Sequence, residues 1–251
     1  GVVDSSGNTT IFIGNFSNEM VGVYGYSGEG WFNDRAAISK VGRPSFLSLT
    51  FGLVLFDVDM DSDLDLFIGN GHVYPQRTKN QDGITYKQAS QLFLNNGDGA
   101  FSIANEKITG IINNKMVVRG VAIGDYDKDG DQDLLLTENN GPAHLWRNDS
   151  ESKNYLRVNL LGVKSNKDGI GSKVFLYINE YKIERLIRTG SSYLSQSEKT
   201  ATFGLGDHDM IDSLSIYWPS GKRETYFDIE INKEILIKEG FGEIELSNKI
   251  K

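Results

Sequence analysis

The sequence has no cysteine and only three histidines among its 251 residues. The lack of cysteine excludes disulfide bonds, thiolate metal sites and a cysteine nucleophile. No two of the histidines stand at metal-ligand spacing, so we interpret His72, His144 and His208 as packing or turn residues. No feature of the sequence marks a base and an acid for a serine nucleophile either.

Two further absences limit the partners. No apolar run is long enough to span a membrane, so we expect no membrane insertion. No basic stripe with interleaved aromatic residues is present, so we expect no nucleic-acid binding. A signal peptide is also missing, but the chain begins at Gly1 in the middle of a repeat. We therefore expect a trimmed chain from an extracellular or periplasmic protein.

What the sequence does contain is two segments crowded with aspartate, DVDMDSDLD at 57–65 and DYDKDGDQD at 125–133. Like charges at this density repel one another unless a cation lies among them. Each segment has aspartate at positions one, three, five, seven and nine. The predicted metal-site residues are Asp57, Asp59, Asp61, Asp63, Asp65, Asp125, Asp127, Asp129, Asp131 and Asp133.

This spacing predicts two Ca2+ loops. Calcium takes six to eight oxygen ligands, and the side chains at positions one, three, five and nine plus the carbonyl at position seven supply them. An EF-hand would place glutamate at position twelve of the second loop, where this chain has Leu136 in a strand-like run. The alternative interpretation is a solvated acidic turn. The net charge of −8 favours calcium, because without the ten loop aspartates the basic residues would be in slight excess.

The two loops differ at position six, which must turn sharply and favours a positive φ. The second loop has Gly130 there and the first has Ser62. A left-handed backbone costs a non-glycine residue roughly 1–2 kcal/mol. We therefore predict weaker calcium binding by the first loop, unless it uses a turn in which serine is unstrained.

The surroundings of the two loops repeat along the chain, which indicates an array of similar units. GLVLFDVDMDSDLDLFIGNG aligns with GVAIGDYDKDGDQDLLLTENNG, and GVVDSSGNTTIFIGN is a third, degenerate copy that we expect to bind no metal. Short strand-like runs separated by turn residues predict an all-β region over residues 1–150. Residues 151–251 contain further strand-like runs but no aspartate loop, so we predict a separate small β-sandwich or barrel there.

Several motifs in order resemble one known family. They include GNGHVYP (69–75), RGVAIGDYDKDGDQDLLLTENNGPAHLWRN (119–148), SNKDGIGSKV (165–174), GSSYLSQSE (190–198) and WPSG (218–221). The loops resemble FG-GAP/VCBS repeats, and the whole set is similar to the cartilage acidic protein family, which ends in an ASPIC/UnbV domain. The resemblance implies a calcium-binding, integrin-like β-propeller followed by a small all-β module. About three blades are visible, so the expected fold is a partial propeller, because a closed one needs at least four.

The function expected from these observations is that of an exported calcium-binding protein for adhesion or ligand binding, in which calcium is structural. The partner would be a protein or a glycan that the sequence does not identify. The alternatives are a carbohydrate-active protein, either a lectin or a glycan-cleaving enzyme, and a purely structural assembly domain. Catalysis is left open, and the sequence favours its absence.

Four remaining features receive structural interpretations. The segments GIG (169–171) and GLG (204–206) are too short to cradle a phosphate and are predicted to be strand-end turns. Trp218 is predicted to be a buried aromatic residue before a turn. A cluster of basic residues is interpreted as a solvated face; it consists of Lys182, Arg185 and Arg188.

Overall fold

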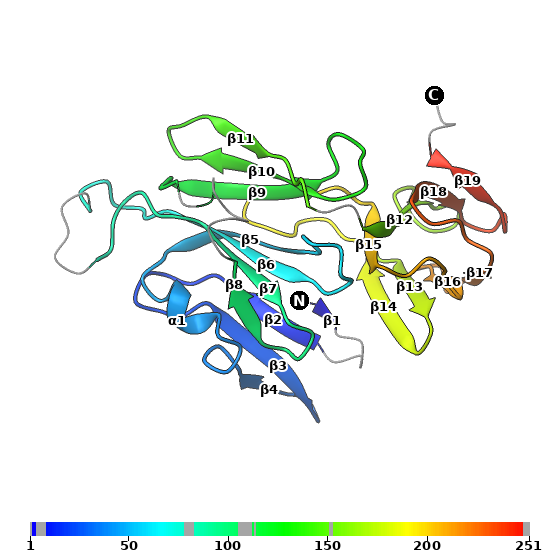
Figure 1. The fold of residues 1–251 in the computed structure, drawn as a ribbon, viewed down its shortest axis with the longest axis horizontal. Helices are drawn as coiled ribbons and strands as arrows, with labels where there is room; N and C mark the ends of the chain where they lie inside the picture. Colours follow the sequence, from blue (N-terminus) through cyan, green and yellow to red (C-terminus); the bar gives the residue numbers. More distant parts are fainter. Residues whose placement is uncertain are drawn as a thin grey trace.

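The computed structural model describes residues 2–3, 9–77, 83–104, 112, 114–150 and 153–247. The described chain forms five small β-sheets and one short helix, α1 (Gly42–Ser45) (Figure 1). This confirms the all-β fold class. None of the helices in the described ranges is long and apolar enough to cross a membrane.

The first three sheets come from the repeat region, and each is an antiparallel meander with the strands in chain order. The first sheet contains β1 (Val2–Val3), β2 (Thr9–Ile13), β3 (Gly22–Gly28) and β4 (Trp31–Asp34). The second contains β5 (Thr50–Phe56), β6 (Asp65–Asn70), β7 (Gln91–Asn95) and β8 (Phe101–Ile103). The third contains β9 (Val118–Gly124), β10 (Asp133–Glu138) and β11 (Ala143–Trp146).

These three sheets pack face to face, as the blades of a propeller do. One apolar cluster joins the first sheet to the second through residues such as Val23 and Ile68. Another joins the second sheet to the third through Phe67 and Leu136. Strand β6 lies between the two clusters and is buried along its whole length. The predicted partial propeller of about three blades corresponds to this stack.

In the second and third sheets, an aspartate segment connects the first two strands. The segment 57–65 joins β5 to β6, and the register pairs Phe56 with Asp65. The segment 125–133 joins β9 to β10, and the register pairs Gly124 with Asp133. The two loops therefore occupy equivalent positions in neighbouring blades. Asp4 and Ser6 of the degenerate third copy lie outside the described residues.

The last two sheets come from the C-terminal part of the chain. One has the order β15-β12-β18-β19 and the other β14-β13-β16-β17. Their strands are β12 (Asn154–Leu161), β13 (Lys173–Ile178), β14 (Tyr181–Leu186), β15 (Ala201–Gly206), β16 (Ser213–Tyr217), β17 (Arg223–Tyr226), β18 (Lys233–Lys238) and β19 (Ile244–Leu246).

These two C-terminal sheets share one apolar core. Leu156 and Val158 of one sheet pack in the same cluster as Leu176 and Leu214 of the other, and all four side chains are essentially inaccessible. The pair β12–β18 is parallel, whereas the other pairs of these two sheets are antiparallel. We call the strands β12 to β19 the C-terminal region. A domain division between residues 150 and 151 stays a prediction, and residues 151–152 lie outside the described ranges.

The hydroxyl-rich stretch 190–198, between β14 and β15, lies against the repeat sheets. Leu53 N donates a hydrogen bond to Ser192 Oγ over 3.1 Å, and Ile123 N donates to Ser197 Oγ over 3.1 Å. Glu198 N donates to the carbonyl of Ile123 over 3.1 Å. Strands β5 and β9 are edge strands of their sheets. The serines therefore satisfy edge amides that would otherwise have no partner in a sheet.

Candidate metal centres

The first loop brings together three of its five aspartates. One carboxylate oxygen from each of Asp57, Asp59 and Asp61 lies within 4.8 Å of the others. Asp57 follows β5 directly and is 1% exposed. Its Oδ1 accepts a hydrogen bond from Asp61 N over 2.9 Å, and its Oδ2 accepts one from Ser62 N over 2.9 Å. These bonds wrap the loop around the first carboxylate.

The other two aspartates of the first loop have different positions. Asp65, at the start of β6, fixes the loop ends because Oδ2 accepts from Val58 N over 2.9 Å and Oδ1 from Asn95 N over 2.8 Å. The amide of Asp63 donates to Asp61 Oδ1 over 2.9 Å. The carboxylates of Asp63 and Asp65 are outside the close group of three.

The second loop has a similar close group, but the aspartate at position nine replaces the one at position five. Its close group consists of Asp125, Asp127 and Asp133, again with oxygens within 4.8 Å of one another. Asp133 Oδ2 accepts from Tyr126 N over 2.7 Å and Oδ1 from Asn148 N over 2.9 Å, as Asp65 does with its own equivalents. Asp129 and Asp131 lie outside the group.

The burial of so many carboxylates shifts their protonation. Burial raises the pKa of Asp57 to about 7, although Arg185 lowers it in part. Burial also raises the pKa of Asp65 to about 8. In the second loop, burial and the charges of Asp129 and Asp133 raise the pKa of Asp131 to about 8. The ionised forms of these carboxylates are therefore not stabilised by enough nearby positive charge.

The residues fit a hard divalent cation. All of the grouped ligand atoms are carboxylate oxygens, which calcium prefers, and ligands on opposite sides of a calcium ion are about 5 Å apart. Asp59 Oδ1 is buried and accepts no hydrogen bond within the described part of the chain. A cation among Asp57, Asp59 and Asp61 would satisfy that atom and offset the like-charge repulsion.

The backbone of both loops is left-handed at two equivalent positions. At position six, φ is +87° for Ser62 and +108° for Gly130. At position four, φ is +57° for Met60 and +65° for Lys128. The need for a positive φ at position six was predicted from the sequence, whereas position four gave no signal because neither residue is glycine or asparagine.

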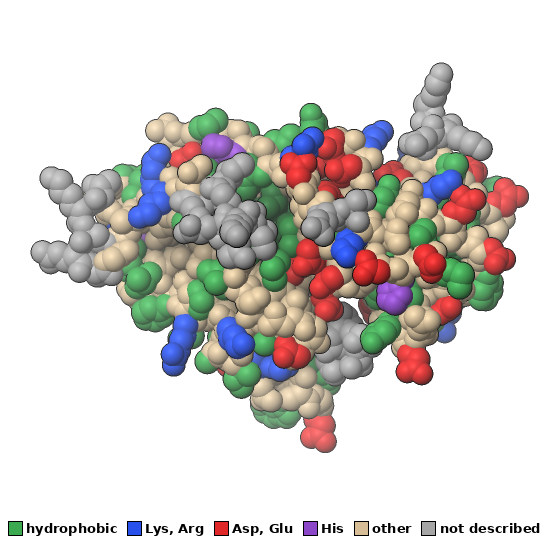
Figure 2. All heavy atoms as spheres, in the orientation of Figure 1, with side chains coloured by type: hydrophobic (Ala, Val, Ile, Leu, Met, Phe, Trp, Pro, Cys, Tyr) green, Lys and Arg blue, Asp and Glu red, His purple; other side chains and the backbone are tan. Residues whose placement is uncertain are grey.

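The loops also face the C-terminal region, which the sequence did not indicate. Figure 2 shows acidic side chains gathered between the repeat sheets and the C-terminal sheets. Arg157 of β12 is 3% exposed, and its Nε lies 3.3 Å from Asp125 Oδ2. Arg157 also contacts Glu198 and Glu234, with nitrogen–oxygen distances of 2.7 and 3.3 Å. Its place in the strand-like run YLRVNLLG gave no hint of this contact, because one arginine in a strand is normally solvated.

Two interpretations made from the sequence are wrong at the first loop. Arg185 of β14 does not lie on a solvated face: its side chain is 13% exposed, and one of its terminal nitrogens donates to the carbonyl of Ser62 over 3.1 Å. Gly204 is not in a strand-end turn but inside β15, where its amide donates to Asp57 Oδ2 over 3.2 Å. Tertiary contact, not local sequence, determines both roles.

Other residues agree with their predicted structural roles. His72 is buried and packs edge-on against Phe16, with ring centroids 5.3 Å apart. His144 lies in β11, with Nε2 3.4 Å from Glu138 Oε2. Trp218 is 3% exposed, as expected for a buried aromatic residue, and its indole N–H donates to Glu224 over 2.7 Å.

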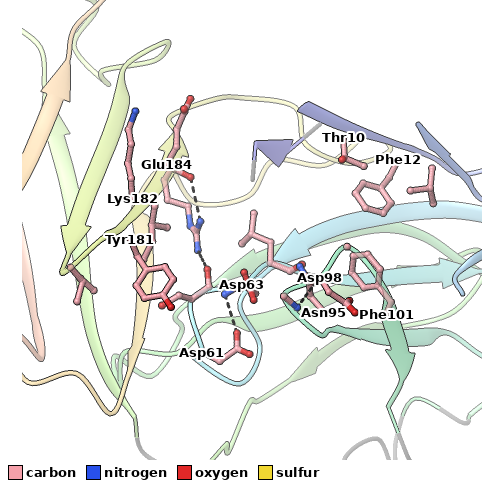
Figure 3. A pocket seen from close by; sticks show the side chains of 18 of the residues that line it. Thr10, Phe12, Asp61, Asp63, Asn95, Asp98, Phe101, Tyr181, Lys182 and Glu184 are labelled. Carbon is pink, nitrogen blue, oxygen red and sulfur yellow. Dashed lines mark hydrogen bonds between the residues drawn. The ribbon is translucent and has the colours of Figure 1, made fainter. Parts of the chain in front are cut away.

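A cavity of about 600 Å³ opens beside the first loop. Figure 3 shows Tyr181 of β14 facing it on one side, where Lys182 and Glu184 of the same strand also line its edge. Asn95, Asp98 and Phe101 of the β7–β8 hairpin lie on the other side, with Asp61 and Asp63 between the two walls. The cavity therefore has aromatic, acidic and basic walls.

Two family models each match a segment of the chain. The model of the FG-GAP-like repeat matches residues 80–136, which include the second loop. The model of the ASPIC and UnbV family matches residues 162–244, which include Arg185 and Gly204. The resemblance to the cartilage acidic protein family is confirmed.

The curated relatives are proteins named cartilage acidic protein 1. The mouse (Mus musculus) protein is 37% identical over 111 residues, and the frog (Xenopus tropicalis) protein is 37% identical over 108 residues. The human (Homo sapiens) protein is 36% identical over 111 residues. Each match covers 41% of this chain and 16% of the relative, so the similarity spans only a small part of those longer proteins.

Proposed function

We propose that this chain is part of an exported calcium-binding protein that serves adhesion or ligand binding, with calcium in a structural role. The observation that carries the proposal is the pair of equivalent loops. Each brings three carboxylate oxygens within 4.8 Å of one another at the same place in its sheet. The FG-GAP-like repeat and the cartilage acidic protein relatives fit an extracellular adhesion or ligand-binding protein.

The loop aspartates have two roles, to hold the ion and to fix the ends of the loop. The groups that would hold the ions are Asp57, Asp59 and Asp61 in one loop and Asp125, Asp127 and Asp133 in the other. A bound calcium ion supplies positive charge that offsets the repulsion between these carboxylates. Asp65 and Asp133, each at the start of the second strand of its sheet, accept hydrogen bonds from Asn95 N at the end of β7 and from Asn148 N just after β11. Calcium would thereby fix each loop between the first two strands of its sheet.

Calorimetric titration with calcium tests this proposal. The metal-free protein should bind two calcium ions, and the double variant Asp59→Asn, Asp127→Asn should bind none. These substitutions keep the side-chain size and remove one charge from each group. A matched control is Asp34→Asn, because Asp34 is exposed in β4, lies outside both groups, and an asparagine there can still accept the hydrogen bond from Ala36 N. The absence of calcium binding by the wild-type chain would contradict the proposal.

A second candidate function is recognition of a glycan in the cavity beside the first loop. Tyr181 is 63% exposed and could stack on a sugar ring, while Asp98 and Asn95 supply hydrogen-bonding groups. A glycan array with and without calcium tests it, with Tyr181→Ala as the variant that should lose binding. Turnover of a bound oligosaccharide would identify an enzyme, and an array without binding would favour a protein ligand or a purely structural domain.

A further inference from the structure

Behind the first aspartate of each loop lies an arginine from the C-terminal region. Arg157 Nε is 3.3 Å from Asp125 Oδ2, and a terminal nitrogen of Arg185 is 4.0 Å from Asp57 Oδ2. The two arginines lie on different strands, β12 and β14, and so belong to different sheets of that region. Two unrelated strands thus place the same kind of group at equivalent positions of two repeats.

The arginines approach the carboxylate oxygen that also closes the loop. Asp125 Oδ2 accepts the amide of Gly130 over 3.1 Å, and Asp57 Oδ2 accepts the amide of Ser62 over 2.9 Å. In both loops the amide belongs to position six. The other oxygen of each carboxylate accepts an amide from position four or five of the same loop, Lys128 or Asp61.

Position six itself contacts the C-terminal region in both loops. Ser62 Oγ donates a hydrogen bond to the carbonyl of Gly204 over 2.7 Å, and the amide of Gly204 donates one to Asp57 Oδ2. A Cβ atom added at Gly204 would lie 2.4 Å from Asp57 Oδ2, so this strand touches the loop without space for a side chain. At the second loop, a Cβ atom added at Gly130 would lie 2.2 Å from the ring of Tyr155.

The negative charge of each loop is large enough to be paired with both an arginine and a divalent cation. One guanidinium faces a loop that carries five carboxylates, so most of the negative charge stays uncompensated. In metal sites, groups that hydrogen-bond to the ligands orient them and hold them ionised, and their loss typically lowers metal affinity about 10–100-fold. Arg157 and Arg185 form ion pairs with the first carboxylate of each loop, at 3.3 and 4.0 Å, and can orient it and keep it ionised through their charge.

We infer that the C-terminal region supplies the outer shell of both metal loops, with Arg157 and Arg185 as positioning residues. This inference rests on calcium binding by the loops, as proposed above. Calcium affinity then depends on docking of the C-terminal region. Because coupling between binding equilibria is reciprocal, calcium in turn strengthens that docking.

The test measures each loop separately by calcium calorimetry on the full chain. In the Asp59→Asn background only the second loop is intact, and Arg157→Met should weaken its affinity about 10–100-fold. In the Asp127→Asn background only the first loop is intact, and Arg185→Met should do the same there. Neither background substitution touches an arginine of the C-terminal region, since Asp127 pairs with Arg147. Arg223→Met is the control, because Arg223 lies over Tyr217 away from both loops.

One further variant protects the test against a loss of folding, and a second disturbs the first loop alone. Arg157→Lys keeps the positive charge beside Glu198 and Glu234 and should recover part of the affinity. Gly204→Ala adds a single methyl group against Asp57 and should weaken the first loop while leaving the second unchanged. Unchanged or tighter calcium binding in the folded arginine and Gly204→Ala variants would overturn the inference and leave the proposed function intact. A wild-type chain that binds no calcium would overturn both.

Discussion

The amide of Gly204 donates a hydrogen bond to Asp57 Oδ2 over 3.2 Å, across 147 residues of sequence. This contact joins the C-terminal region to the first residue of an acidic loop in the repeats. A glycine is required there because a Cβ atom would also come within 2.5 Å of the Met60 backbone. The C-terminal region, which the ASPIC and UnbV model matches, is therefore fitted directly against a candidate metal centre of the repeats.

Calcium is expected to stabilise the fold. A ligand at 100 times its Kd adds about 2.7 kcal/mol for each site that exists only in the folded state. For a chain of this size, that corresponds to a rise in melting temperature of about 5–10 °C per site. Thermal melts in excess EGTA and after addition of calcium measure the difference. Identical melting curves would count against metal loops of any kind.

The first loop is expected to bind calcium roughly ten-fold more weakly than the second. Ser62 holds φ at +87°, a conformation that costs a residue with a side chain roughly 1–2 kcal/mol, and a factor of ten is about 1.4 kcal/mol. Calorimetry on Asp125→Ala, which leaves only the first loop, and Asp57→Ala, which leaves only the second, compares them. Equal affinities would mean that the bond from Ser62 Oγ to Gly204 offsets the strain.

Glu239 gives the C-terminal region an acid-sensitive contact. Its carboxylate accepts hydrogen bonds from the amides of Val163, Lys164 and Ser165 over 2.7–2.8 Å, and Ser220 Oγ also donates to it. Burial alone would raise its pKa, but these hydrogen bonds outweigh burial and lower the pKa to about 2. Because the folded pKa lies below the unfolded value of about 4.5, the stabilisation is complete above pH 4.5. It is lost as the pH falls from 4.5 towards 2.

The variant Glu239→Gln tests this contact. It places an amide group among donors, and we expect it to lower the free energy of unfolding by about 1–3 kcal/mol at pH 7. The loss should shrink at pH 3, because the carboxyl group of the unfolded wild-type chain is then protonated while the folded one, with a pKa of about 2, stays mostly ionised. Denaturant unfolding at pH 7 and pH 3 measures both values. The exposed residue Glu243 provides the control substitution, Glu243→Gln. Equal losses at the two pH values would contradict this account.

The C-terminal region is expected to fold alone. Its core cluster is built entirely from its own residues, from Leu156 to Ile237, and no group of potential metal ligands is found among the described residues there. A fragment beginning at Asn154 should give a β-type circular dichroism spectrum that does not respond to calcium. It should also melt below the full chain, because Arg185 loses its contact with Asp57. A helical or calcium-dependent spectrum would contradict this prediction.

Much of the architecture was determined by the sequence alone, because its signals are local. Alternating apolar residues and turn clusters fix strands and hairpins, and the aspartates at every second position place their carboxylates within one short loop. The repeated frame around 57–65 and 125–133 gave the equivalence of the two sheets. Even the positive φ at position six could be predicted, because Gly130 occupies it in one copy.

Only the tertiary structure decided what covers the loops. Arg157, Arg185 and Gly204 stand in ordinary strand patterns, and no local rule distinguishes a buried arginine from a solvated one or a glycine at a close contact from a glycine in a turn. Their roles arise because the C-terminal sheets pack against the repeats with these residues facing Asp125 and Asp57. Such contacts depend on the relative placement of segments that lie far apart in the chain, which short-range propensity does not encode.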